Sequence, residues 1–234
     1  MNLLAIDTCT EIASVTLMTS ESRVSRVLSG IQKSSGHILK LCDEVFQETG
    51  TLIKDVDSII FTKGPGAFTG VRMCVGVVQG LSMSCNIPTM GFSTLELLGF
   101  RASQILSSEK IAVALDARMG EVYWAIYNQG KISKLRICNP NDVDILDTNY
   151  IGVGTGWDAY GDMLSSASGV IETDLTIFPE SSSLIDLALQ SFDRGYSANF
   201  ELPQPIYLRN NVAQSLVLSY APPEHLDQKT EYYF

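Results

Sequence analysis

Two carboxylates are the residues of this sequence best placed to do chemistry. Asp7 and Asp116 each end a short apolar run, a pattern typical of a buried strand that leads into a turn. Two such turns facing each other across a cleft can hold a nucleotide triphosphate, since carboxylates position Mg²⁺ through water and turn amides reach the phosphates. The candidate nucleotide-binding residues are Asp7, Thr8, Thr10, Asp116, Arg118, Gly154 and Gly156.

These candidates predict ATP or ADP with Mg²⁺, bound in a cleft between two lobes or at the interface of a complex. We expect no intrinsic cofactor besides. The alternative is that Asp7 and Asp116 only accept hydrogen bonds from the amides of their own turns. Sequence alone leaves both interpretations open.

A glycine-rich loop, Gly64-Pro65-Gly66-Ala67-Phe68-Thr69-Gly70, stands between a predicted strand and a predicted helix. It superficially resembles a phosphate loop at a helix amino terminus. It lacks the Gly-Lys-Ser/Thr of a Walker A motif, and its spacing is not the Gly-x-Gly-x-x-Gly of dinucleotide-binding folds. The alternative is that its glycines and proline only shape a sharp entry from strand to helix.

Cysteine and histidine usage argues against a metal site and against a disulfide framework. Neither residue type forms a ligand pair at metal-binding spacing, and no Cys-x-x-Cys occurs. We therefore expect no metal, and free thiols in a reducing cytoplasm. The residues concerned are Cys9, Cys42, Cys74, Cys85, Cys138, His37 and His225.

The charge balance limits the partners of the chain. Its 234 residues include 16 basic and 26 acidic side chains, which gives a formal charge of −10. Such a surface repels phosphate backbones and anionic membranes, and no lysine or arginine cluster offsets it. We expect no secretory signal, since the first residues lack a basic region and Asp7 interrupts the apolar run, and the best membrane candidate, residues 71–83, is too short to span a bilayer. We expect a cytoplasmic protein with no membrane partner, reaching nucleic acid only through another component.

The predicted elements repeat along the chain. Residues 3–7 and 112–116 are both apolar strands that end in aspartate, and two more strands follow each of them. This internal duplication of about 109 residues predicts an α/β protein with two lobes, each a mixed β-sheet with helices. We place the first lobe at residues 1–102, the second at 103–215 and a flexible tail at 216–234.

The predicted helices over residues 36–48 and 71–85 are unusually apolar. The second carries Gly76 and Gly80 four residues apart, a spacing that lets another backbone approach closely. Either these helices are simply buried within their own lobe, or together they form an association surface. An exposed apolar pair would also make the isolated protein a homodimer.

Four motifs carry a resemblance to a known family: residues 64–72, 116–124, 152–157 and 207–211. Together they resemble the bacterial TsaB (YeaZ) family of tRNA threonylcarbamoyladenosine biosynthesis proteins, over residues 2 to about 215. The resemblance implies the two-lobed actin/sugar-kinase/Hsp70 ATPase-like, or RNase H-like, fold. It also implies work in forming N6-threonylcarbamoyladenosine at position 37 of tRNAs that read codons starting with A.

The resemblance further implies partners. In that family a TsaD-like paralogue carries out the transfer, TsaB dimerises with it, a TsaE-like ATPase joins the complex, and tRNA is met only through the complex. TsaD-like relatives carry a His-x-x-x-His metal pair where this sequence has Thr94 and Leu98. A non-catalytic scaffold subunit is therefore the leading hypothesis. As its partner interface we select Ile38, Leu41, Val45, Met73, Val77 and Gly80.

Two other functions are compatible with parts of the sequence. The alternative is an autonomous nucleotide-dependent ATPase or kinase-like enzyme that uses Asp7 and Asp116. A metallopeptidase has almost no support, because the histidine ligands are missing.

Overall fold

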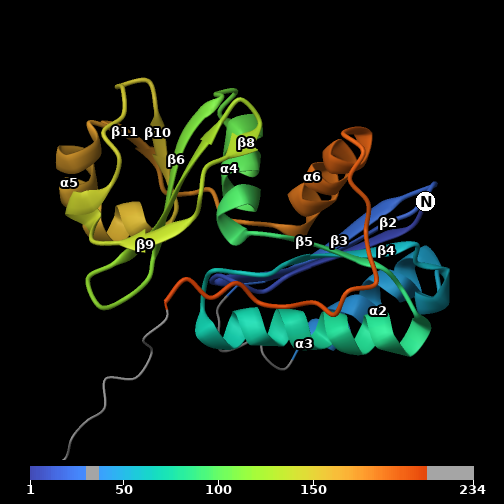
Figure 1. Cartoon of the computed structure of the whole chain (residues 1–234). Coiled ribbons are helices and arrows are strands. Elements are labelled where there is room, and N and C mark those ends of the chain that lie inside the picture. Colours follow the sequence, from blue (N-terminus) through green and yellow to red (C-terminus); the bar gives the residue numbers. More distant parts are fainter. Residues whose placement is uncertain (30–36, 210–234) are drawn as a thin grey trace, which may run out of the picture.

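The computed structural model describes residues 1–29 and 37–209. The tail predicted at residues 216–234 lies outside this part of the chain. Two β-sheets lie side by side, with helices on their faces and between them (Figure 1). None of the helices in the described part combines the length and the apolar character needed to cross a membrane.

The first sheet has the strand order β3-β2-β1-β4-β5. Strand β1 pairs antiparallel with β2, where Leu4 lies opposite Leu17, and parallel with β4. The burial of every residue of β1 and β4 explains why the two strands are uninterrupted apolar runs. The strands of this sheet are β1 Leu3–Asp7, β2 Ile12–Met18, β3 Arg23–Ser29, β4 Ser58–Thr62 and β5 Thr89–Phe92.

The second sheet repeats this topology, with the order β8-β7-β6-β10-β11. Strand β6 pairs antiparallel with β7 and parallel with β10, as β1 does with β2 and β4. The duplication and the two-lobed α/β fold of the actin/sugar-kinase/Hsp70 ATPase-like class are thus confirmed. The strands are β6 Lys110–Asp116, β7 Val122–Asn128, β8 Lys131–Ile132, β10 Ile151–Val153 and β11 Glu172–Asp174, with β9 Arg136–Cys138 paired to β7.

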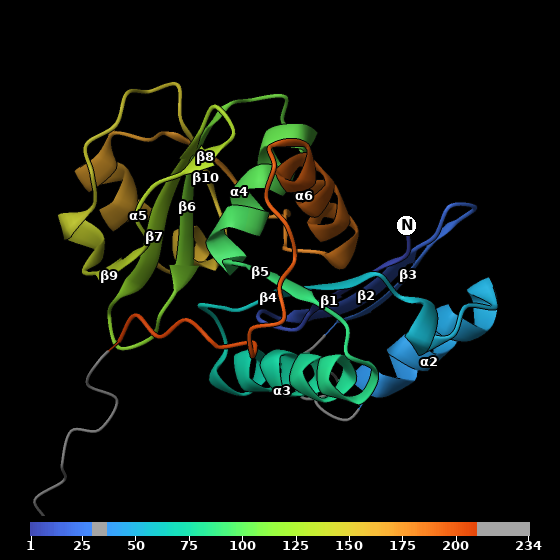
Figure 2. The same cartoon turned by 45° about the vertical axis from the view of Figure 1, so that its right-hand side comes forward.

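The helices divide the core into three parts. Helices α2 (Ile38–Thr49) and α3 (Phe68–Cys85) cover the outer face of the first sheet, and α5 (Thr155–Ser168) covers that of the second (Figures 1 and 2). Helices α4 (Thr94–Ile105) and α6 (Ser181–Asp193) pack between the two sheets in one shared cluster. The lobes therefore share a hydrophobic core.

Local details differ from the sequence-based expectation in identifiable ways. Helix α3 starts at Phe68, three residues before the predicted start. The strand predicted over residues 131–137 is split into β8 and β9. Just beyond β8, the Ser133 amide donates to the Ile126 carbonyl at 2.8 Å, and the Ile126 amide donates to the Ser133 hydroxyl at 2.9 Å. The five cysteines are free, as predicted.

The chain returns to the first lobe near its end, which corrects the predicted domain division. Helix α6 packs against β1, β2 and β4, although residues 103–215 were assigned to the second lobe. We call residues 196–209 the return segment. It runs along β5 and α3 toward the second lobe (Figure 1), and the Ile206 amide donates to the Lys63 carbonyl at 2.7 Å. A cut at residue 102 would not separate two independent units.

Half of the predicted partner interface lies inside the first lobe. Ile38, Leu41 and Val45 are 3%, 4% and 0% exposed, packed in the cluster that α2 shares with the sheet. This corrects the expectation, because a side chain filling the core of its own lobe is not available to a partner. Of the predicted α3 residues, Met73 and Val77 are half-buried and Gly80 is exposed.

Candidate functional site

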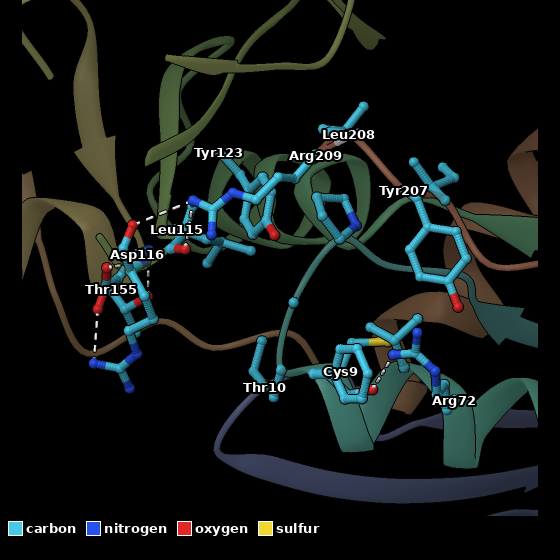
Figure 3. Close-up of a pocket in the computed structure, with 18 of the residues that line it drawn as sticks. Cys9, Thr10, Arg72, Leu115, Asp116, Tyr123, Thr155, Tyr207, Leu208 and Arg209 are labelled. Carbon is cyan, nitrogen blue, oxygen red and sulfur yellow. Dashed lines mark hydrogen bonds and ion pairs between the residues drawn. The ribbon is translucent and has the colours of Figure 1, made fainter. Parts of the chain in front are cut away.

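A cavity of about 710 Å³ lies between the two lobes. One wall is formed by the β1–β2 turn and by residues 65–72, and the opposite wall by the β6–β7 turn and Thr155. Residues 206–209 of the return segment close a third side. Figure 3 shows Cys9 and Thr10 of the first lobe facing Asp116 and Leu115 of the second across this space.

Asp7 lies beneath the first wall rather than in the cavity. Its side chain is fully buried, and its Oδ1 accepts hydrogen bonds from the Cys9 amide at 3.1 Å and from the Thr62 hydroxyl. Its Oδ2 has no partner in the structure. Burial raises the pKa of Asp7 to about 6, and the bonds from Thr62 and Cys9 oppose that rise.

Thr8 is buried beside it. The Thr8 hydroxyl donates to the Gly70 carbonyl at 2.7 Å, and the residue is 1% exposed. Thr10, by contrast, reaches the cavity, and its buried hydroxyl has no partner. Of the three first-lobe residues predicted to bind nucleotide, Asp7 and Thr8 therefore hold the turn together, and Thr10 faces the cavity.

The glycine-rich loop is filled by the chain itself. A Cβ on Gly66 would lie 2.1 Å from the Cys9 carbonyl oxygen, and a Cβ on Gly70 would lie 2.1 Å from that of Thr8. The Ala67 amide at the start of α3 donates to the Cys9 carbonyl at 2.8 Å. These glycines permit backbone-to-backbone packing, which favours the structural interpretation of the loop over phosphate binding.

Asp116 faces the cavity from the second lobe, held by its own turn. Its Oδ1 accepts from the Arg118 amide at 2.8 Å, and its Oδ2 lies 2.9 Å from the Arg118 guanidinium. The Tyr160 hydroxyl is 3.4 Å from Oδ1. Arg118 has a positive φ of 62° and a largely exposed side chain. The structure therefore brings Asp116 and Arg118 to the cavity as an ion pair.

The predicted Gly154 and Gly156 do not line the cavity. Gly154 has a φ of +99°, and its Cβ would lie 2.4 Å from the Ala114 carbonyl oxygen. A Cβ on Gly156 would lie 2.8 Å from that of Ala114. Both glycines let α5 start close against β6. Thr155 between them does line the cavity, and its hydroxyl accepts from the Asp116 amide at 3.1 Å.

A group of aromatic and basic residues at the cavity mouth was not predicted from the sequence. The Arg72 guanidinium lies 3.3 Å from the centre of the Phe68 ring and 5.1 Å from that of Tyr207. Arg209 pairs with Glu121 and donates to the Ala117 carbonyl at 3.2 Å. Tyr207 and Arg209 belong to a motif that signalled the resemblance, but no local pattern shows that the return segment reaches the cavity.

The first-lobe residues do not fit the predicted Mg²⁺-nucleotide. Asp7 and Thr8 are sealed under the wall, and the loop glycines face backbone carbonyls instead of open space. A ligand in this cavity would contact Thr10, Asp116 and Arg118. Within residues 1–29 and 37–209, no group of three or more histidine, cysteine, aspartate or glutamate side chains could hold a metal ion.

Comparisons with known proteins agree on one family. A family model described as TsaD, tRNA N6-adenosine threonylcarbamoyltransferase, matches residues 29–156. The tRNA threonylcarbamoyladenosine biosynthesis protein TsaB of Escherichia coli is 32% identical over 91% of this chain and 96% of its own length. The protein of the same name from Haemophilus influenzae is 29% identical over 91% and 95%.

Solved structures give the same result. YeaZ from Pseudomonas aeruginosa superimposes with a TM-score of 0.81 at 34% identity, covering 88% of this chain and 99% of that protein. A second Pseudomonas aeruginosa structure, described as similar to the peptidase YeaZ, has the same TM-score and identity and covers 89% and 99%. With this fold, this cavity and these relatives, the chain belongs to the TsaB (YeaZ) family of tRNA threonylcarbamoyladenosine biosynthesis proteins.

Proposed function

We propose that this chain acts in the formation of N6-threonylcarbamoyladenosine in tRNA as a non-catalytic subunit that binds and activates a TsaD-like transferase. The relatives named TsaB support the role in this biosynthesis. The match of residues 29–156 to the transferase model supports a common origin of the two proteins. A TsaE-like ATPase is the third component, and tRNA reaches this chain through the complex.

The non-catalytic role is supported by the residues at the positions of the metal-binding histidines of TsaD-like relatives. Thr94 and Leu98 are both fully buried in α4. The Thr94 amide donates to the Gly64 carbonyl at 3.0 Å, and Leu98 packs against Gly154 at the start of α5. These positions hold α4 between the lobes, and a hydroxyl and an alkyl group replace the two imidazoles.

The single observation that carries the docking proposal is the outer face of α3. Phe68 and Met83, near its two ends, are 62% and 73% exposed. Gly76 and Gly80 lie between them, with open space where a Cβ would stand. A partner helix could therefore approach the α3 backbone closely and cover both apolar residues. In the isolated protein the same face would pair with a second copy.

Reconstitution tests the proposal. This chain, a TsaD-like protein, a TsaE-like protein, ATP and unmodified tRNA are mixed with the threonylcarbamoyl donor, and each protein is left out in turn. We expect modified tRNA only when this chain and the transferase are both present. Full modification without this chain would overturn the proposal, and so would transfer by this chain without the TsaD-like protein.

A second measurement distinguishes the non-catalytic subunit from an autonomous ATPase. Its use of Asp7 is disfavoured by the complete burial of that side chain. The purified chain with Mg²⁺ and ATP should show no turnover near the range of typical enzymes, roughly 1 s⁻¹ or above. Turnover in that range that is lost in an Asp116→Asn variant would replace the scaffold with an enzyme.

A further inference from the structure

A second cavity, of about 900 Å³, lies apart from the cleft and shares no lining residue with it. Its walls come from the ends of β4 and β5, the first turn of α4, the β7–β8 turn, the end of α6 and the return segment. Figure 2 shows the return segment passing over β5 beside α4. Elements distant in the sequence therefore enclose it.

Charged side chains of both signs line this cavity without pairing with each other. Its cations are Lys63, Lys131 and Arg194, and its carboxylates are Glu96 and Glu201. Within the described part of the chain, no ion pair within 4.0 Å involves any of the five. Burial raises the pKa of Glu96, and the nearby charges of Lys63 and Arg194 oppose that rise. Opposite charges thus face one space and remain separated.

Two glycines make room for two of the cations. A Cβ on Gly91 would lie 3.2 Å from the Cδ atom of Lys63, so the lysine stem lies directly over this residue. A Cβ on Gly130 would lie 2.9 Å from a guanidinium nitrogen of Arg194. Arg194 also donates to the Gly130 carbonyl at 3.2 Å. These contacts fix where Lys63 and Arg194 stand.

Glu96 is fixed from the opposite side. Its amide donates to the Ser93 hydroxyl at 3.1 Å, so Ser93 caps the start of α4. This cap fixes the backbone of Glu96 in the first helical turn, where its side chain lines the cavity. The half-buried carboxylate of Glu96 therefore has a defined position on the cavity wall.

The separated charges decide the class of ligand. A simple anion would meet the Glu96 carboxylate, and a simple cation would meet Lys63 and Arg194. A small zwitterion satisfies both: its carboxylate pairs with the cations and its ammonium pairs with Glu96. Apolar side chains of the same cavity, Met90, Phe92 and Ile132, offer a surface to an apolar substituent.

We infer that this second cavity binds a free α-amino acid with an apolar side chain, with Lys63 and Arg194 holding its carboxylate and Glu96 its ammonium group. A long polyanion such as RNA fits less well, because the chain as a whole carries a charge of −10. The inference does not depend on the proposed docking function.

Calorimetric titration of the isolated protein tests the inference with L-leucine and L-phenylalanine. N-acetyl-L-leucine lacks the ammonium group and L-leucinamide lacks the carboxylate. We expect saturable binding of the free amino acids and a loss of about tenfold or more in affinity for each derivative. No binding of either amino acid, or equal binding of the derivatives, would overturn the inference.

Variants locate the site. Lys63→Gln should weaken L-leucine binding about tenfold but leave the binding of L-leucinamide unchanged, since that derivative has no carboxylate. Glu96→Gln keeps the backbone amide that donates to the Ser93 cap. It should weaken the binding of L-leucine but leave the binding of N-acetyl-L-leucine unchanged, since that derivative has no ammonium group. Where a derivative binds too weakly to titrate, competition against L-leucine supplies its affinity.

Matched controls exclude other sites. Lys54→Gln removes an exposed lysine outside both cavities, and Arg118→Gln removes a cation of the interlobe cleft. Neither should change L-leucine affinity, and circular dichroism should show all variants folded. Loss of L-leucine binding in Arg118→Gln would show that the ligand binds in the interlobe cleft. If the protein bound a short single-stranded RNA and Lys63→Gln abolished that binding, the second cavity would be a polyanion site. Either result would overturn the inference.

Discussion

The Cys9 carbonyl accepts a hydrogen bond from the Ala67 amide at 2.8 Å, which joins the first turn of the protein to the amino end of α3. In phosphate-binding proteins, free backbone amides at the start of a helix hold the phosphate. Here that amide is bound by the chain itself, and the carboxylate of Asp7 is sealed beneath it. The first lobe therefore uses an arrangement suited to ligand binding for its own stability.

Gly66→Ala tests this closed arrangement. The new Cβ would lie 2.1 Å from the Cys9 carbonyl oxygen, so the backbone must shift, and we expect a loss of about 2–4 kcal/mol of unfolding free energy. Gly76→Ala is the matched control, because it has open space on the exposed side of α3 and should stabilise by about 0.5–1 kcal/mol. Urea denaturation measures both. Equal stability of the two variants would show that the loop is not tightly packed.

Because of Asp7, the free energy of unfolding should fall as pH rises, whereas a carboxylate with a lowered pKa has the opposite effect. Its pKa of about 6 in the folded protein exceeds the ordinary value of 3.8, so the folded state binds this proton more tightly. The stabilisation from this group is complete below about pH 4 and is lost as pH rises through about 6. Between protonated and fully ionised Asp7, the free energy of unfolding differs by on the order of 3 kcal/mol.

Asp7→Asn isolates that contribution. Relative to wild type, the variant should gain stability between about pH 4.5 and about pH 7.5, because it has no carboxylate to ionise in the core. Urea denaturation at both pH values measures the change, and Asp162→Asn, at an exposed position of α5, is the control. A stability difference that does not vary with pH would contradict the raised pKa.

Arg209 should hold the return segment against the second lobe. It pairs with Glu121 and bonds the Ala117 carbonyl, and the partial exposure of this pair limits its contribution to about 1 kcal/mol. In Arg209→Ala we expect faster hydrogen exchange at the amides of Ile206, Tyr207 and Leu208. Arg136→Ala, which breaks an ion pair with Asp144 inside the second lobe, should leave those amides unchanged. Unaltered exchange in Arg209→Ala would show that other contacts hold the segment.

Much of the fold could be predicted because it is encoded locally. Strands β1 and β4 are apolar runs buried at every position, and the repeated aspartate at the end of β1 and β6 identified the duplication. The short β11 was missed, since three residues give no periodic signal. The place of α6 was also missed, because its amphipathic pattern does not say which sheet it covers.

The site was harder to predict because its residues come together only in the folded chain. The apolar stripe of α2 was assigned to a partner, but a stripe facing the core and a stripe facing a partner have the same helical spacing. Asp7 has the residue type of a ligand, and only its burial shows that it is not accessible. Arg209 reaches the first cavity only because the chain returns, and the same return segment encloses the cavity that Lys63 lines, which leaves no local pattern.

Docking through α3 is tested by the affinity of this protein for its TsaD-like partner after a change on the outer face of that helix. Gly80→Arg places a long charged side chain in open space, so the isolated protein should remain folded. Gly161→Arg makes the same change in open space on α5, in the other lobe. We expect Gly80→Arg to weaken binding at least about 100-fold in a titration, and Gly161→Arg to bind like wild type. Wild-type affinity in folded Gly80→Arg would contradict docking through α3.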